Sequence, residues 1–188
     1  MNPSSVTVGL ISDTHGLLRP EAVALLAGSD FIIHAGDVGS PRILDELARL
    51  APLTAVRGNV DSGDWAMALP EVAMLTLGGI RIQVIHRLDD LTSAPVAHDV
   101  EAVIYGHSHR PGQERRDGVL YVNPGSAGPR RFSLPITLGR LTIANAVLAA
   151  DLIELDIGPS CTTPGIAGII SIAENGEGSG VRLKKREG

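Results

Sequence analysis

Short apolar segments that alternate with helical patterns constrain the fold of this chain more than any other feature. A β-branched run from Val6 to Ile11 predicts a buried strand, and apolar spacing from Leu18 to Ala27 predicts a helix after it. The plan repeats with a strand over Phe31–Ala35 and a helix that starts near Pro41, and a third strand covers Leu53–Val56. Alternating strands and helices predict parallel pairing, which places ligands beyond the carboxyl ends of the strands.

The pattern changes in the second half of the chain, where antiparallel strands enter. Gly78-Gly79 separates the apolar runs Val72–Leu77 and Ile80–His86, which predicts a tight hairpin. Four more strands are predicted at Ala102–Tyr105, Val119–Val122, Ile136–Ile143 and Val147–Asp156. We therefore expect an α/β fold of two facing mixed β-sheets flanked by helices on the outside, a four-layer arrangement.

The length of 188 residues allows one domain with a sizeable core. We assign residues 1–158 to this domain and residues 159–188 to a C-terminal extension. The last part, from Glu174 to Gly188, is rich in Gly, Glu and Lys and has few large apolar residues, so we expect it to be disordered.

Charge and cysteine content exclude several classes of function. A formal charge of −5 and a pI near 5.6 argue against a broad nucleic-acid surface, because such binding requires phosphate neutralisation by basic residues. A single cysteine, Cys161, permits no internal disulfide and no zinc site built from several thiolates. With neither a signal pattern nor a membrane-spanning stretch in the sequence, we expect a cytoplasmic protein without a membrane partner.

Polar residues with metal-binding side chains follow the predicted strands in five separate segments. Each segment is weak evidence alone, since Asp-x-His and His-x-His occur by chance and a strand-end histidine such as His86 is often a hydrogen-bonded core residue. Asp13 and His15 are two apart, so an extended strand end would direct both side chains to one face. Together the segments predict a site for two divalent metals. The candidate ligands are Asp13, His15, Asp37, Asn59, His86, His107 and His109.

From Val6 to Asp156 the chain resembles the calcineurin-like metallophosphoesterases, and particularly their small YfcE-type branch of manganese-dependent phosphodiesterases. The motifs that carry the resemblance are Asp13-Thr-His15, Gly36-Asp37, Arg57-Gly58-Asn59-Val60-Asp61, His86, Gly106-His107-Ser-His109 and Asn123-Pro124-Gly125-Ser126.

The resemblance implies how the candidate ligands divide between two ions. It places Asp13, His15, Asp37 and His109 on the first metal, and Asp37, Asn59, His86 and His107 on the second, with Asp37 as the bridge. A hydroxide that spans both ions would attack phosphorus. We expect Mn²⁺, although these donors would also accept iron, nickel, cobalt or zinc.

Two positions depart from the family pattern. Many larger relatives have a histidine directly after the motif asparagine, where this chain has Val60, which cannot protonate a leaving group. Activated phosphodiesters should therefore react best. The small branch commonly has glycine after the strand-end histidine, where this chain has Arg87, either a phosphate clamp or a solvent-exposed side chain. Arg130 and Arg131 are weaker candidates for substrate contact.

Three functional hypotheses remain open from the sequence. The first is a metal-dependent phosphodiesterase acting on a small phosphoester, which the intact set of ligands favours. The second is a non-catalytic interaction scaffold of the Vps29 type on the same fold. The third is a phosphomonoesterase for a small metabolite. The substrate-selecting loops are expected at Ser62–Pro70 and Leu88–Pro95, and neither they nor the oligomeric state can be interpreted further.

Overall fold

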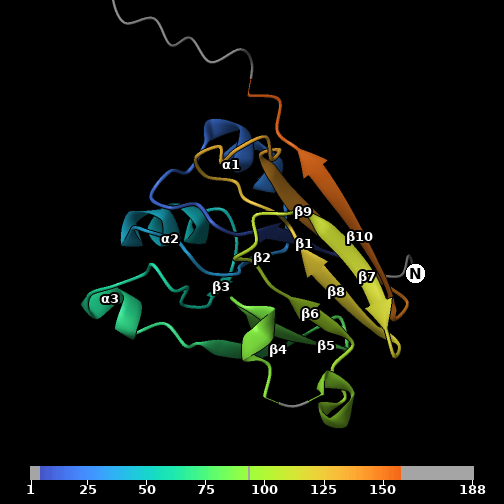
Figure 1. Cartoon of the computed structure of the whole chain (residues 1–188). Helices are drawn as coiled ribbons and strands as arrows, with labels where there is room; N and C mark the ends of the chain where they lie inside the picture. Colours follow the sequence, from blue (N-terminus) through green and yellow to red (C-terminus); the bar gives the residue numbers. More distant parts are fainter. Residues whose placement is uncertain (1–4, 93, 158–188) are drawn as a thin grey trace, which may run out of the picture. The chain divides into compact units, whose positions relative to one another are not determined.

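Two five-stranded sheets form the centre of the computed structural model, which describes residues 5–92 and 94–157 (Figure 1). The first sheet has the order β10-β9-β1-β2-β3. Its strands are β1 (Val6–Ile11), β2 (Phe31–His34), β3 (Leu53–Ala55), β9 (Thr137–Ala144) and β10 (Val147–Glu154). Strands β1, β2 and β3 run parallel, whereas β9 pairs antiparallel with both β1 and β10.

The second sheet has a parallel centre with antiparallel edges, in the order β4-β5-β6-β8-β7. Its strands are β4 (Val72–Leu77), β5 (Ile80–Ile85), β6 (Ala102–Ile104), β7 (Gly112–Arg116) and β8 (Val119–Asn123). The central strands β5, β6 and β8 are parallel, and the edge strands β4 and β7 are antiparallel to their neighbours.

The main hydrophobic core lies between the two sheets. Alternation along β1 decides which side chains enter it, since Val8 and Leu10 face the other sheet while Ile11 packs on the opposite side. Each fully buried side chain of this size contributes about 1.5–3 kcal/mol relative to exposure. From the second sheet, Ile82, Val84 and strands β6 and β8 complete the same core.

Helices cover the outer face of the first sheet. Helices α1 (Pro20–Leu26) and α2 (Pro41–Ala48) bury Ala22, Leu26 and Leu47 against Ile11 and Ile32. The outer face of the second sheet is covered instead by a segment with two short 3-10 helices, η1 (Leu88–Asp90) and η2 (Pro95–His98). The expected pair of facing mixed sheets is confirmed, with true helices mainly on one side (Figure 1).

Besides the two 3-10 helices, the structure contains strand β7 and helix α3, which the sequence did not predict. Strand β7 has the sequence Gly-Gln-Glu-Arg-Arg and is mostly exposed at the sheet edge, so it lacks an apolar pattern. Helix α3 (Asp64–Met67) lies within the expected loop Ser62–Pro70. The expected C-terminal extension, residues 159–188, lies outside the described residues. Among the described helices, none has the length and apolar content needed to cross a membrane.

Candidate metal centre

The structure brings the seven candidate ligands together at one edge of the two sheets. Loops after β1, β2 and β3 carry Asp13, His15, Asp37 and Asn59, and the ends of β5 and β6 carry the three remaining histidines. Ligand atoms gather in two groups, Asp13-His15-His109 and Asp37-His86-His107, each within 4.8 Å of one another. Each group therefore combines donors from both sheets.

A left-handed backbone positions most of these side chains. Asp13, His15, Asp37, His107 and His109 all have positive φ, between 46° and 67°. Asp13 and His15 do reach one group as expected, but tight turns orient them, so the expected extended strand end was wrong. Such conformations cost about 1–3 kcal/mol each for residues other than glycine and cluster at functional sites. Their concentration here marks this sheet edge as functional.

In the first group, one carboxylate oxygen of Asp13 is buried without a hydrogen-bond donor among the described residues. Its Oδ2 accepts hydrogen bonds from Ser12 Oγ (2.6 Å) and from the backbone N–H of His107 (3.1 Å). Its Oδ1 is buried and accepts no hydrogen bond from any described residue, although His109 Nε2 lies 3.3 Å away. An unpaired buried carboxylate oxygen is costly unless a cation satisfies it. A metal ion between these atoms would satisfy it.

The two histidines of the first group also suit a cation. His15 Nε2 and His109 Nε2 lie 3.1 Å apart. That separation is close to what two nitrogen ligands about 2.0–2.1 Å from one ion would have. Burial, the largest cause, lowers the pKa of His15 despite the nearby carboxylates of Asp37 and Asp13. A neutral imidazole has the free lone pair that metal binding needs.

In the second group, the ring of His86 is oriented by the backbone. Its Nδ1 donates to the Ala35 carbonyl at 2.8 Å, which leaves Nε2 as the ring atom that could bind a metal. Nε2 lies 3.1 Å from Asn59 Oδ1 and 3.3 Å from Asp37 Oδ1. Burial works against a charged ring, but the contacts with Asp37 and Ala35 raise the pKa of His86. Surroundings that stabilise a proton on Nε2 also stabilise a metal cation there.

Asp37 lies between the two groups. Its Oδ1 faces His86 of the second group, and its Oδ2 lies 3.9 Å from His15 Nε2 of the first. Burial acts to raise the pKa of Asp37, but hydrogen bonds to His86 and to the Val60 N–H outweigh it and lower the pKa. Asp37 is therefore an ionised carboxylate with one oxygen directed to each group.

Asp61 is a supporting residue whose role the sequence did not indicate. It is buried, and its carboxylate accepts backbone N–H bonds from Gly39 (2.7 Å), Gly58 (2.8 Å) and Val38 (3.2 Å). These bonds join the loop that carries Asp37 to the loop that carries Asn59. The Asp in the motif Gly58-Asn59-x-Asp61 thus holds two ligand loops in register.

A second such residue is His34, which joins the loops after β1 and β2. Its Nδ1 accepts from the Gly36 N–H (3.2 Å), and its Nε2 lies 2.9 Å from Thr14 Oγ1. Because that hydroxyl already donates to the Val38 carbonyl, the ring must carry its proton on Nε2. A second proton on Nδ1 would face the Gly36 N–H. Burial accordingly lowers the pKa of His34 to about 4.

The neutral state of His34 predicts a pH-dependent stability. The unfolded chain binds a proton at this histidine near pH 6.5, whereas the folded chain resists it down to about pH 4. The contribution of His34 to the free energy of unfolding is therefore fully present above pH 6.5. It is lost as the pH falls toward 4, by up to about 3 kcal/mol. Urea unfolding of chelator-treated protein at several pH values should show this slope.

The comparison uses one variant of the buried histidine and one control that changes no titratable group. His34→Gln should be less stable at neutral pH but should lose less stability than the wild type between pH 6.5 and 4.5. Gln113→Asn, at an exposed site on β7, should keep the wild-type slope. An unchanged slope in His34→Gln would show that other groups cause the acid sensitivity.

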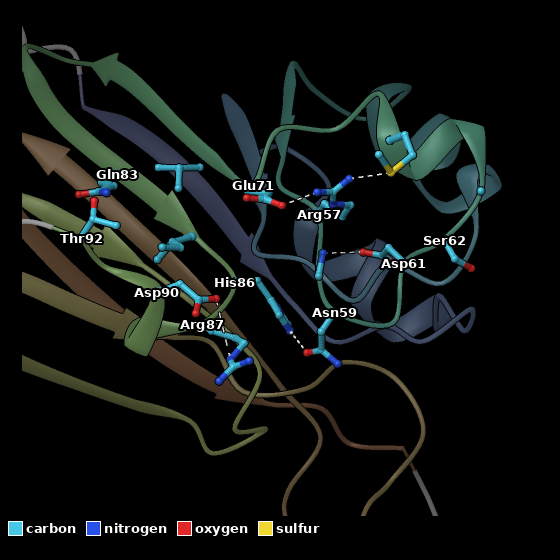
Figure 2. Close-up of a pocket in the computed structure, with 15 residues that line it drawn as sticks. Arg57, Asn59, Asp61, Ser62, Glu71, Gln83, His86, Arg87, Asp90 and Thr92 are labelled. Atoms are coloured by element: carbon cyan, nitrogen blue, oxygen red, sulfur yellow. Dashed lines mark hydrogen bonds and ion pairs between the residues drawn. The ribbon is translucent and has the colours of Figure 1, made fainter.

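A cavity of about 950 Å³ opens beside the second group, and Asn59 and His86 line it (Figure 2). Arg57, also in its wall, is held by the Glu71 carboxylate and by Met67 Sδ. Arg87 lines the same cavity near His86. Both expected loop regions contribute to the wall, through Ser62 and Thr92.

Comparison with known proteins identifies the family to which this arrangement belongs. The sequence profile of the calcineurin-like phosphoesterase superfamily domain matches residues 6–146. The chain belongs to this superfamily. It is also 37% identical, over 165 residues, to a probable metallophosphoesterase of Methanocaldococcus jannaschii, a match that covers 81% of this chain and 83% of that one.

Solved structures show the same superfamily fold. An archaeal phosphodiesterase is similar with a TM-score of 0.64 and 23% identity, over 79% of this chain and 100% of that one. Vps29 of Cryptosporidium parvum is similar with a TM-score of 0.65 and 18% identity, over 80% and 98%. This member of the superfamily thus shares its fold with the phosphoesterase YfcE of E. coli and with Vps29, and it has two candidate His/Asp metal sites.

Proposed function

We propose that this protein is a divalent-metal-dependent phosphodiesterase with two ions, most readily Mn²⁺, held by Asp13, His15, Asp37, Asn59, His86, His107 and His109. The observation that carries the proposal is the position of Asp37, whose two oxygens face different histidine groups. Two bound cations supply a nucleophile from water at neutral pH and neutralise charge on a phosphoryl group. Imidazole, carboxylate and amide donors suit such ions.

Other residues of the chain hold the candidate ligands in position. His86 keeps its Nε2 directed at the second group because Ala35 holds its Nδ1. Asp61 and His34 keep the ligand loops in register, which limits the reorganisation needed when a substrate binds. The cavity beside Asn59 and His86 offers space for one ester arm of the substrate.

Val60 supports a preference for phosphodiesters with good leaving groups. It follows Asn59 directly, is 47% exposed, and contributes its backbone N–H to Asp37 rather than a proton donor to the substrate. We expect the rate to rise steeply as the leaving-group pKa falls across a series of aryl phosphodiesters. General acid assistance, when present, contributes about 10²–10⁴ in rate.

A histidine in place of Val60 tests this explanation. Val60→His should raise the rate for esters with poor leaving groups by about tenfold, a small part of the range that a positioned acid achieves. It should change the rate for p-nitrophenyl esters little, so the dependence on leaving group becomes shallower. A wild-type rate that is independent of the leaving group would contradict the assigned role of Val60.

Reconstitution with metal tests the proposed function itself. Metal-stripped protein should be inactive on bis-p-nitrophenyl phosphate and should gain activity as Mn²⁺ is added, with saturation near two ions per chain. p-Nitrophenyl phosphate serves as the comparison, because faster hydrolysis of this monoester would favour a phosphomonoesterase. Two bound ions with no hydrolysis of either ester would favour an interaction scaffold.

A further inference from the structure

The cavity beside the second ligand group is larger than a reacting phosphoryl group requires. The candidate ligands Asn59 and His86 lie at one end of it, and Gln83 and Thr92 form part of its wall farther from them (Figure 2). Its volume of about 950 Å³ is in the range of pockets that enclose a whole small ligand. The cavity therefore has room for a substituent of the phosphoester beyond the reacting phosphorus.

Most charged groups in the cavity wall already have partners. Arg57 is paired with Glu71 and contacts Met67 Sδ. Asp61 is satisfied by the backbone N–H groups of the two ligand loops. These residues shape the wall, and their hydrogen-bonding capacity is committed to the protein.

Arg87 differs because its guanidinium has donor capacity to spare. Its Nε is buried and makes no hydrogen bond to any described residue. The carboxylate of Asp90 lies 3.9 Å from this Nε, which is beyond hydrogen-bond reach (Figure 2). The side chain is 43% exposed and lines the cavity. A guanidinium that is only loosely paired, and whose buried Nε makes no hydrogen bond to a described residue, suits an anion with two acceptor oxygens.

We propose that Arg87 binds a second anionic group on the substrate, a carboxylate or phosphate carried by the ester arm that occupies the cavity. This inference rests on the proposed phosphodiesterase function and names its substrate class. The reacting phosphoryl group would be held by two cations. Among the described wall residues, Arg57 is already committed to Glu71, so a second anion on the substrate would bind to Arg87. The preferred substrate is then a phosphodiester with an anionic arm.

Three p-nitrophenyl phosphodiesters with four-carbon arms test the proposal. Their arms derive from 4-hydroxybutanoate, from its neutral amide, and from butanediol monophosphate. The Mn²⁺-loaded wild type should have a kcat/KM about tenfold higher for an anionic arm than for the amide, mainly through a lower KM. Comparison of the carboxylate and phosphate arms identifies which anion fits better.

Variants of Arg87 should reduce this preference. In Arg87→Ala the ratio of anionic to amide ester should fall to about one, and Arg87→Lys should retain part of it because the charge remains without the planar donors. Arg49→Ala removes the same charge from an exposed site after α2 and should keep the full ratio. An equal loss for all esters in Arg87→Ala would overturn the proposal in favour of a clamp on the reacting phosphoryl group.

Substitution of Asp90 should increase the preference for an anionic arm. Because its carboxylate competes for Arg87, Asp90→Asn should raise the preference for an anionic arm about threefold, and this gain should disappear when Arg87→Ala is added. A gain that persists in the double variant would show that Asp90 acts by general repulsion, and the proposal would fail.

A binding measurement separates this proposal from the proposed function. Calorimetry can follow the phosphomonoester of 4-hydroxybutanoate binding to wild-type and Arg87→Ala protein, each loaded with Mn²⁺. Weaker binding in the variant supports the role of Arg87 even if no ester is hydrolysed, whereas equal binding contradicts it. Absence of hydrolysis of all three esters would refute the phosphodiesterase alone.

Discussion

Asp37→Asn should lower phosphodiesterase activity by more than about a hundredfold, exceeding the roughly 10–100-fold cost of changing a residue that only supports a ligand. The substitution keeps the size of the side chain but removes the charge that faces both histidine groups. Both ions should bind more weakly, since each loses the same carboxylate. Measured metal content per chain should fall together with kcat/KM for bis-p-nitrophenyl phosphate.

Comparison variants make the bridging assignment specific. His15→Asn and His86→Asn each remove a donor from one group, so each should leave more bound metal than Asp37→Asn. Asp45→Asn makes the same chemical change at an exposed site on α2 and should retain wild-type activity. Two tightly bound ions and near wild-type activity in Asp37→Asn would refute the bridge.

Gly58→Ala should be nearly as damaging, although glycine binds no metal. A Cβ at this position would lie 2.1 Å from both the backbone N and Oδ1 of Asp37, far too close for any contact. The backbone at Gly58 does not adopt positive φ, so collision alone would cause the effect. Asp37 would have to move, and a displacement of about 1 Å in a catalytic site can cost about 10² in rate.

The matched control is Gly112→Ala in strand β7, where an added Cβ meets nothing within 4 Å. It should keep both activity and metal content. Gly58→Ala should also lower the free energy of unfolding by about 1–3 kcal/mol, the usual cost of overpacking. Circular dichroism and urea unfolding distinguish a displaced ligand from a misfolded chain. Full activity in Gly58→Ala would mean that the position of Asp37 is not critical.

The sequence predicted most of the fold because its buried strands have continuous apolar runs. It did not predict β7, whose polar residues project from a sheet edge and leave no periodic signal. It also did not predict that helix α1 begins only at Pro20, where proline suits the first turn and excludes an earlier one.

For the site, the sequence nominated side chains but could not determine backbone geometry. The structure brings all of the nominated residues to one edge, through left-handed turns rather than an extended strand end, and six of them form two groups that could each hold a metal. Asp61 and His34 were not assigned supporting roles because hydrogen bonds between loops depend on the packing of β2 beside β1 and β3. Such contacts between distant segments have no local pattern.

The division of ligands between the sheets has a consequence for the whole domain. Loops of the first sheet supply both carboxylates, the amide and His15, and the second sheet supplies the other three histidines. A cation bound in either group would therefore cross-link the sheets, and under the proposed function the rate of hydrolysis would depend on their alignment. Substitutions that let one sheet slide on the other, such as Ile82→Ala in the shared core, should impair turnover without contacting the substrate.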